Sequence, residues 1–298
     1  MSLEQQSTHH KNWYDKYYKV ILLIPVAILL ISLIYLIGFY KSTGNLFLRD
    51  SSLSGGTTIT LQGDYDHLQL ESKLKETFKD VRVRTISDRS TSKNLALIID
   101  SSANPEELKS SVESILGIKI DEKNANIEFS GASLSNSFYK QLIIALIISF
   151  ILMSCVIFFL FRTFIPSFAV IFAAFADIIM PLAVINYFGV SVSAAGIAAF
   201  LMLIGYSVDT DILLTTRVLK KKEGSVNQRI YSSFKTGMFM TITALLAVIP
   251  AFILVTTLPD SFRQIFLILS LGLFADIINT WLTNASIIKW YAVKKRLS

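Results

Sequence analysis

The stretch Ala199-Phe-Leu-Met-Leu-Ile-Gly-Tyr-Ser-Val-Asp209-Thr-Asp211-Ile-Leu-Leu-Thr-Thr-Arg217 places two aspartates inside an otherwise apolar run. Such a run is close to the ~20 residues that a membrane-spanning helix needs. An ionised carboxylate in hydrocarbon costs about 3 kcal/mol or more, so acids at this depth usually face a polar pathway or a partner. The stretch therefore predicts a membrane protein that moves something, or that couples ion flow to work.

The composition of the whole chain agrees with this prediction. Of the 298 residues, 52% are hydrophobic and only 17% are charged, which is typical of a membrane protein with several spans. The net charge of +6 comes from basic residues that cluster just outside the apolar runs, as the topology of membrane proteins requires. A nucleic-acid partner is therefore not expected.

Six apolar stretches are each long enough to approach a membrane crossing. The predicted spans are about 20–40, 142–161, 165–187, 190–214, 236–258 and 264–290. The first span is too long for a signal-peptide core, and no Ala-x-Ala site follows it, so it is expected to stay as an anchor. Spans three and four are separated only by Phe188-Gly189, which predicts a tight hairpin.

The basic residues of the short loops predict the orientation of these spans. They lie before span one, between spans two and three, around the connection of spans four and five, and at the C-terminus; examples are Lys19, Arg162, Lys220 and Lys294. By the positive-inside rule, both termini (1–19 and 291–298) face the cytoplasm. The segment 41–141 is then an extracytoplasmic domain, and 142–290 holds spans two to six of a cytoplasmic (cell) membrane protein.

The segment 41–141 reads as strand, helix, strand, strand, helix, strand, which is the ferredoxin-like order. Its strands are predicted at 56–62, 81–86, 95–99 and 127–129, and its helices at about 68–78 and from Pro105 onward. The single cysteine, Cys155, excludes an intrachain disulfide, so this domain is expected to fold by burying its own core. The fold class is thus a six-span α-helical membrane protein with an α+β domain.

Asp209 and Asp211 are expected to point in different directions, because two residues advance an α-helix by about 200°. Asp209 shares a face with Gly205, which could admit a neighbouring helix closely, and Asp211 shares one with Ser207. Lys235, early in span five, could pair with Asp209 or take part in a proton relay between helices. The alternative is that neighbouring Ser, Thr and Asn residues cap the acids and that Lys235 only sets orientation.

Two further acids lie in matching five-residue segments, Phe175-Ala-Asp177-Ile-Ile and Phe274-Ala-Asp276-Ile-Ile. Transporters often contain internal repeats, although chance similarity between apolar helices would also give this match. Asp177 and Asp276 are therefore added to Asp209, Asp211 and Lys235 as candidates for an ion or proton relay.

Cofactor sites are not indicated. The histidines His9, His10 and His67 are scattered outside the predicted spans, so no metal site is expected. The sequence also contains no phosphate-binding glycine loop and no nucleophile elbow. We therefore expect that the chain is not an enzyme and that its energy comes from an ion gradient or from a partner.

Four stretches resemble the SecF family of protein-export membrane proteins, in particular its archaeal form. Ser54-Gly55-Gly56-Thr57 would otherwise be a simple turn into the first strand, but it is similar to the family's glycine pair. The others are Gly131-Ala-Ser133, the fourth-span segment with Gly205, Ser207 and Arg217, and Lys235-Thr-Gly-Met-Phe-Met-Thr241-Ile-Thr243. The resemblance covers essentially the whole chain, and its fourth-span motif is the most specific.

The resemblance implies membership of the RND superfamily. It also implies a non-enzymatic accessory role with a SecD-like subunit beside a SecYE-type channel, acting on translocating polypeptides in contact with membrane lipid. In bacterial relatives, acids and an arginine of spans four and five are implicated in proton-driven work. Those relatives have Asn-Asp-Thr where this chain has Asp209-Thr210-Asp211, and Lys235 stands for the arginine, keeping its charge without its planar fork.

Two other function classes were compared with this one. An RND-type exporter of lipids or small molecules normally carries twice as many spans, so this chain would form half of such a protein. An intramembrane aspartyl protease would use two acids on adjacent helices, but its Gly-x-Gly-Asp motif is poorly matched by Gly205-Tyr-Ser-Val-Asp209.

Overall fold

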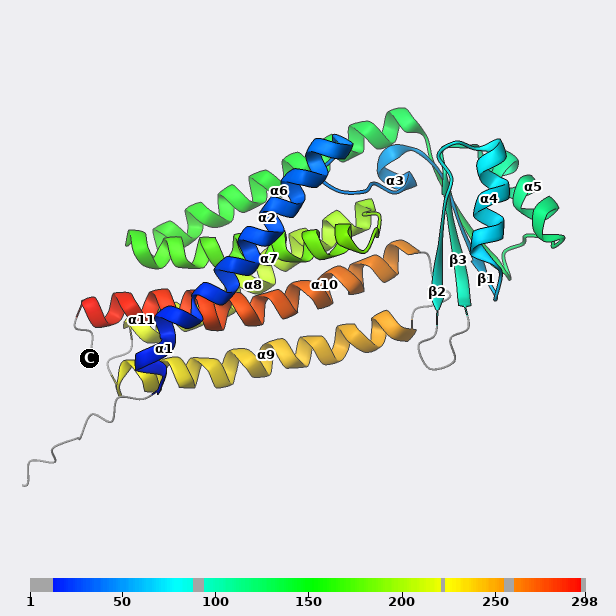
Figure 1. Cartoon of the computed structure of the whole chain (residues 1–298). Coiled ribbons are helices and arrows are strands. Elements are labelled where there is room, and N and C mark those ends of the chain that lie inside the picture. Colours follow the sequence, from blue (N-terminus) through cyan, green and yellow to red (C-terminus); the bar gives the residue numbers. More distant parts are fainter. Residues whose placement is uncertain (1–12, 88–93, 221–222, 255–259, 296–298) are drawn as a thin grey trace, which may run out of the picture.

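The computed structural model of the protein describes residues 13–87, 94–220, 223–254 and 260–295. A bundle of long helices carries a small sheet domain at one end (Figure 1). Among the described residues, six helices are long and apolar enough to cross a membrane; they span Tyr14–Thr43, Ala132–Phe161, Phe164–Tyr187, Ala194–Lys220, Val226–Leu254 and Ser261–Lys294. The predicted number of spans is therefore observed, while His9, His10 and the predicted span end 255–258 lie outside the described residues.

Several helices extend beyond the predicted spans. Helix α6 (Ala132–Phe161) begins ten residues before the predicted start at 142, and α9 (Val226–Leu254) begins ten residues before 236. The extra turns contain polar residues. A helix can continue past the apolar part of its sequence, so hydropathy alone does not show where the helix begins or ends. The last part of the predicted domain 41–141 is consequently the first part of α6.

The N-terminal part of the chain leads into the sheet domain. Helices α1 (Trp13–Ile21) and α2 (Leu23–Thr43) run along the bundle, and α2 ends at Gly44 in the left-handed conformation, which glycine adopts at little cost. The short helix α3 (Ser51–Ser54) follows. Asp50 caps it, since its side chain accepts a hydrogen bond from the backbone N–H of Ser52.

The sheet domain shows the predicted order of elements. These are β1 (Gly56–Gln62), α4 (His67–Thr77), β2 (Arg82–Ser87), β3 (Asn94–Ser101), α5 (Pro105–Leu116) and β4 (Ala125–Ser130). The strands form one antiparallel sheet in the order β2-β3-β1-β4. Ile59 pairs with Ile99 and Ile127 in neighbouring strands, and its side chain packs with Leu70 of α4 and Leu108 of α5 in one buried core. The domain therefore folds without a disulfide.

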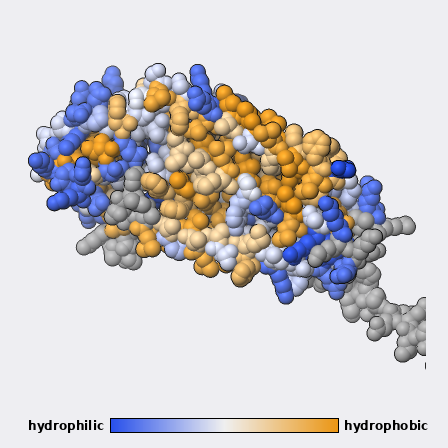
Figure 2. Space-filling model, turned by 180° about the vertical axis from the view of Figure 1, so that it is seen from behind, coloured by the Kyte–Doolittle hydropathy of each residue, from blue (hydrophilic) through white to orange (hydrophobic). Residues whose placement is uncertain are grey.

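The remaining helices form the bundle. They are α7 (Phe164–Tyr187), α8 (Ala194–Lys220), α10 (Asp260–Ile278), the π-helix η1 (Asn279–Asn284) and α11 (Ala285–Lys294). Helix α8 packs against α6, α7, α9 and α10, so its side chains reach the centre of the bundle. Figure 2 shows an apolar surface along the bundle with hydrophilic residues at both ends, as a membrane-spanning protein requires.

The predicted tight hairpin between spans three and four is a longer connection, residues 188–193. The connection is longer because Val192 pairs with another segment. Its backbone N–H donates to Leu48 O at 2.6 Å, and its carbonyl oxygen accepts from Asp50 N–H at 3.2 Å. This segment pairs with the chain that follows α2 instead of entering α8 at once. It thereby holds the start of α8 against the base of the sheet domain.

Candidate functional site

Three acids from three helices meet inside the bundle. Asp177 of α7, Asp211 of α8 and Asp276 of α10 are 1%, 0% and 0% exposed. All three were among the residues selected from the sequence. We call Asp177, Asp211 and Asp276 the buried acid cluster.

Neutral side chains supply the hydrogen bonds of this cluster. Asp177 accepts a bond from the Ser207 hydroxyl and another from Asn279 Nδ2, the latter at 2.7 Å. Asp211 Oδ1 accepts from Thr280 Oγ1 at 2.8 Å and from Asn284 Nδ2 at 2.7 Å. Each of these two carboxyl groups therefore has an amide donor and a hydroxyl neighbour.

Asp276 differs from the other two acids in its contacts. Its carboxyl oxygens lie 3.1 and 3.2 Å from Thr210 Oγ1, 3.0 Å from Thr280 Oγ1 and 3.5 Å from Thr241 Oγ1. Helices α8 and α9 contribute two of these threonines, and η1 contributes the third. The surroundings of Asp276 consist of hydroxyl groups rather than amides.

The π-helix η1 positions the residues that contact the acids. Its hydrogen bonds join residues five apart, as the bond from Ala285 N–H to Thr280 O shows. Asn279 and Asn284 are also five apart, so both reach the cluster, and both are buried. Asn279, Thr280 and Asn284 were not predicted as site residues, although the four polar residues of Asn279-Thr-Trp-Leu-Thr-Asn284 stand out within an apolar span.

In the part of the chain that the structure describes, no basic side chain balances the cluster. Among the described residues, no lysine or arginine forms an ion pair with Asp177, Asp211 or Asp276, and no group of three His, Cys, Asp or Glu side chains is arranged to hold a metal. Ionising several buried carboxyl groups without a counter-charge is very costly. The cluster is thus suited to bind and release protons or another small cation.

Asp209 lies outside the buried acid cluster. The offset of about 200° from Asp211 puts its side chain on the exposed face of α8, so the predicted divergence of the two acids is confirmed. There it lines a shallow depression of about 420 Å³ with Ile212, Leu213, Thr216, Arg217 and Met240.

Lys235 does not join Asp209 in this structure. Its side chain is exposed on α9, and Nζ lies 5.0 Å from the centre of the Tyr231 ring one turn earlier. Among the described residues, no ion pair links Lys235 to Asp209 or Asp211. The structure therefore places these two predicted relay residues on the outer surface of the bundle.

The fourth-span motif residues have different roles from those expected. A Cβ on Gly205 would meet no atom within 4 Å, so the expected close approach of a helix at Gly205 is wrong. Ser207 contacts Asp177, as described above, and Arg217 donates to Ser232 O at 3.0 Å and Thr236 Oγ1 at 2.9 Å. Arg217 thus links the end of α8 to α9.

The glycine pair before β1 is required by close packing. Gly55 and Gly56 have φ angles of 85° and 122°, which side-chain-bearing residues rarely adopt. A Cβ on Gly55 would lie 2.4 Å from Ala132 Cα, and one on Gly56 would lie 2.2 Å from Ser101 O. The pair is therefore a junction between α3, the sheet and α6, and more than the simple turn considered from the sequence.

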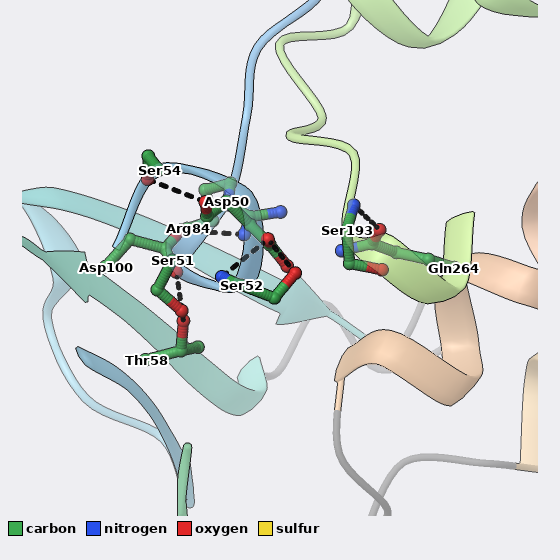
Figure 3. A network of polar contacts seen from close by, with 9 residues as sticks. All are labelled: Asp50, Ser51, Ser52, Ser54, Thr58, Arg84, Asp100, Ser193 and Gln264. Carbon is green, nitrogen blue, oxygen red and sulfur yellow. Dashed lines mark hydrogen bonds and ion pairs between the residues drawn. The ribbon is translucent and has the colours of Figure 1, made fainter. Parts of the chain in front are cut away.

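The junction network, as we call the polar contacts of Asp50, Ser52, Ser193, Ala194 and Gln264, lies between the sheet domain and the bundle. Figure 3 shows the contacts around Asp50 and the contact of Ser193 with Gln264. Ser52 Oγ accepts a hydrogen bond from Ala194 N–H at 3.0 Å, and Gln264 Oε1 accepts one from Ser193 N–H at 2.8 Å. Ser52 Oγ also donates to Asp50 Oδ1 at 2.6 Å. These contacts join α3 to the starts of α8 and α10, the helices that carry Asp211 and Asp276.

Comparisons with known proteins agree on one family. Residues 110–294 match the family model described as protein export membrane protein SecD/SecF, C-terminal. The protein-export membrane protein SecF of Methanocaldococcus jannaschii is 35% identical over 94% of this chain and 98% of its own length. SecF of Methanothermobacter thermautotrophicus is 36% identical over 93% of both chains.

Solved structures show the same fold. The translocon-associated membrane protein SecDF of Thermus thermophilus has a TM-score of 0.74 and 17% identity over 95% of this chain. A second SecDF structure, in a super-membrane-facing form, has a TM-score of 0.58 at 18% identity. The chain spans only 38% of the length of the first SecDF chain. The matching family model and the relatives of similar length show that this chain belongs to the SecD/SecF family of protein-export membrane proteins.

Proposed function

We propose that this chain is an accessory subunit of the protein-export machinery, which assists translocation of polypeptides across the cytoplasmic membrane. The observation that carries the proposal is the match, over 98% of its length, to a relative named protein-export membrane protein SecF. The alternative of an RND-type exporter half has less support, because relatives of similar length bear protein-export names. The subunit would act beside a SecYE-type channel, on translocating polypeptides, and in contact with membrane lipid.

A SecD-like subunit is the proposed direct partner. The SecDF chain of similar fold is much longer than this chain, which matches 38% of it, so a second subunit would supply the remainder. The outer surface of α8 and α9 is the proposed contact face. It carries Asp209 and Lys235 among apolar residues, and charged groups at this depth favour a protein neighbour over lipid.

The buried acid cluster is the proposed site of ion coupling, with Asp209 and Lys235 acting at the partner face. Asp211 and Asp276 lie on helices whose first turns contact the sheet domain and the short helix before it. Ala194 N–H of α8 donates to Ser52 Oγ of α3, and Ser261 Oγ of α10 donates to Glu128 Oε2 of β4. A change in the charge of the cluster could therefore move α8 relative to α10 and be transmitted to the domain. The basic loops favour cytoplasmic termini and an extracytoplasmic domain.

Affinity purification of the tagged chain from its own membranes tests the partner proposal. Recovery of a SecD-like subunit is expected, and recovery of none would contradict the proposal. Met240→Trp enlarges a residue beside Asp209 at the proposed face and should lower that recovery. Phe159→Trp, on the exposed side of α6 where Phe159 is 75% exposed, is the matched control and should leave recovery unchanged.

A further inference from the structure

The inner side of helix α1 is held to two other helices. Asp15 Oδ1 lies 2.7 Å from Lys289 Nζ of α11, and the centre of the Tyr14 ring lies 3.8 Å from the same nitrogen. Asn227 Nδ2, at the start of α9, donates to both carboxyl oxygens of Asp15, at 3.1 and 3.0 Å. These contacts fix the rotation of α1 about its own axis, and therefore fix which residues point away from the bundle.

The outer side of α1 carries two lysines. Lys16, Tyr17 and Lys19 are exposed, and Lys16 Nζ lies 5.2 Å from the centre of the Tyr17 ring. Among the described residues, neither lysine forms an ion pair. Asp15, the only acid in the sequence of α1, is paired with Lys289 on the inner side. The outer side of α1 therefore keeps its positive charge.

The lysines lie at the end of an apolar stripe that continues into α2. Val20, Leu23 and Ile24 follow Lys16 at helical spacing, and each of these three side chains is more than half exposed. Lysine stems lie along apolar groups while their ammonium groups reach polar ones, and tyrosine rings are enriched at the level of lipid headgroups. The outer face of α1 thus has the side chains of a helix at the boundary between lipid tails and headgroups.

A similar pair of side chains lies at the end of α11, the helix on which α1 packs. Lys294 Nζ is 5.1 Å from the centre of the Trp290 ring, and both residues are exposed. Lys295 follows and is exposed as well. Two neighbouring helices therefore present lysines beside aromatic rings at the end of the bundle that is remote from the sheet domain.

We propose that α1 is a binding site for anionic phospholipids, in which Lys16 and Lys19 contact the headgroup and Val20 and Leu23 lie along the acyl chains. Lys294 extends the same surface. Charge complementarity selects this ligand, because each lysine near an anionic membrane surface strengthens binding about fivefold. An acidic protein segment would pair with the lysines but would leave the apolar stripe uncovered. The inference rests on the lipid contact in the proposed function and adds the class of lipid and the residues that bind it.

Energy transfer from tryptophan to a labelled lipid tests the site on the purified full chain in neutral detergent micelles. Trp13 begins α1 and Trp290 lies on α11, so both donors belong to the helices of the proposed site. Transfer to dansyl-labelled phosphatidylglycerol should exceed transfer to phosphatidylcholine with the same label at the same lipid fraction. Equal transfer to the two lipids would overturn the proposal.

Two double variants of equal charge locate the site. Lys16→Gln/Lys19→Gln keeps the length of the side chains but removes both charges, and should lower the preference for phosphatidylglycerol by about threefold or more. Lys73→Gln/Lys79→Gln, at exposed positions of the sheet domain, is the matched control and should leave the preference unchanged. Equal losses in both would show that only net charge matters and would overturn the site. Lys16→Arg/Lys19→Arg should keep the preference, and its loss there would also overturn the site, even if the glutamine variant does not fold.

Inorganic phosphate distinguishes a lipid site from a simple anion site. At equal ionic strength, phosphate and chloride should lower the transfer to phosphatidylglycerol equally, and a larger loss in phosphate would overturn the lipid assignment. If the lipid preference is observed but no SecD-like partner is recovered with the chain, the export proposal fails and the lipid site stands. If the partner is recovered but both lipids bind equally, the lipid site fails and the export proposal stands.

Discussion

Asp177 of α7 and Asp276 of α10 occupy the same position in two copies of Phe-Ala-Asp-Ile-Ile, and both are buried in one polar cluster. The two helices pack against each other, so the matching segments meet in the fold. Their surroundings nevertheless differ, because an amide contacts Asp177 whereas hydroxyl groups surround Asp276. One sequence pattern thereby supplies two acids with different hydrogen-bonding roles.

Close packing of α9 on η1 predicts the effect of a small substitution. A Cβ on Gly237 would lie 2.4 Å from Trp281 Cζ2, so Gly237→Ala should displace this ring and destabilise the protein by about 1–3 kcal/mol. Gly205→Ala is the control: it meets no atom within 4 Å and should be neutral or stabilising by up to about 1 kcal/mol. Thermal unfolding in detergent measures both, and equal stabilities for the two variants would show that the Trp281 contact is unimportant.

Much of the fold follows from local sequence patterns. The six apolar runs predicted the spans, and the alternating residues of 56–62 and 81–86 with the short apolar run 95–99 predicted the sheet, because these patterns reflect burial directly. The start of α6 at Ala132 could not be predicted in this way, since its first turns are polar. The pairing of Val192 with residues 48–50 was likewise missed, because it joins segments far apart in the sequence.

The candidate site was only partly predictable. Helical geometry showed that Asp209 and Asp211 diverge, but it did not show which of them faces the bundle centre. That choice depends on the packing of α8 against α7 and α10, which buries Asp211 and exposes Asp209. The polar residues of η1 were missed because periodicity assumes a regular α-helix, whereas the π-helix brings Asn279 and Asn284 to the same side.

The buried lysine of α11 predicts a second stability effect. Lys289 is 1% exposed; its Nζ lies 2.7 Å from Asp15 Oδ1 and 3.8 Å from the centre of the Tyr14 ring. Lys289→Met should cost about 1–3 kcal/mol, because it removes the ion pair between the buried Lys289 and Asp15. Asp15→Asn in the Lys289→Met background should add little. Fully additive losses in thermal unfolding would mean that the pair contributes no coupling.

The junction network predicts an effect at Gln264. Gln264→Leu removes the acceptor of the Ser193 N–H bond and leaves a buried donor unpaired, at a cost of about 1–3 kcal/mol. Gln264→Glu keeps an acceptor oxygen at this site and should be less harmful. Thermal unfolding of both variants distinguishes them, and an undiminished stability of Gln264→Leu would show that this contact does not hold the starts of α8 and α10 together.

The sheet domain contains a carboxyl group whose effect depends on pH. Burial acts to raise the pKa of Asp80, but hydrogen bonds from Ser102 and Ser101 outweigh it and lower the pKa below 3.8; one of them is from Ser102 N–H at 2.6 Å. A lowered folded-state pKa gives stability that is present above the ordinary value and is lost as pH falls through the folded-state pKa. Asp80→Asn should therefore unfold at a lower temperature than wild type at pH 7, and this difference should shrink in acid. A constant difference would contradict the role of ionised Asp80.

The central claim is tested most directly by measuring protein export in cells whose only copy of this protein carries Asp276→Asn. The substitution removes an ionisable group of the buried acid cluster at nearly constant volume. The expected result is a clear loss of secretion of a reporter protein, with normal membrane levels and normal recovery of the SecD-like partner, while Asp80→Asn, in the sheet domain, secretes the reporter at the wild-type rate. Wild-type secretion by the Asp276→Asn cells would contradict the claim that the buried acid cluster couples ion movement to export.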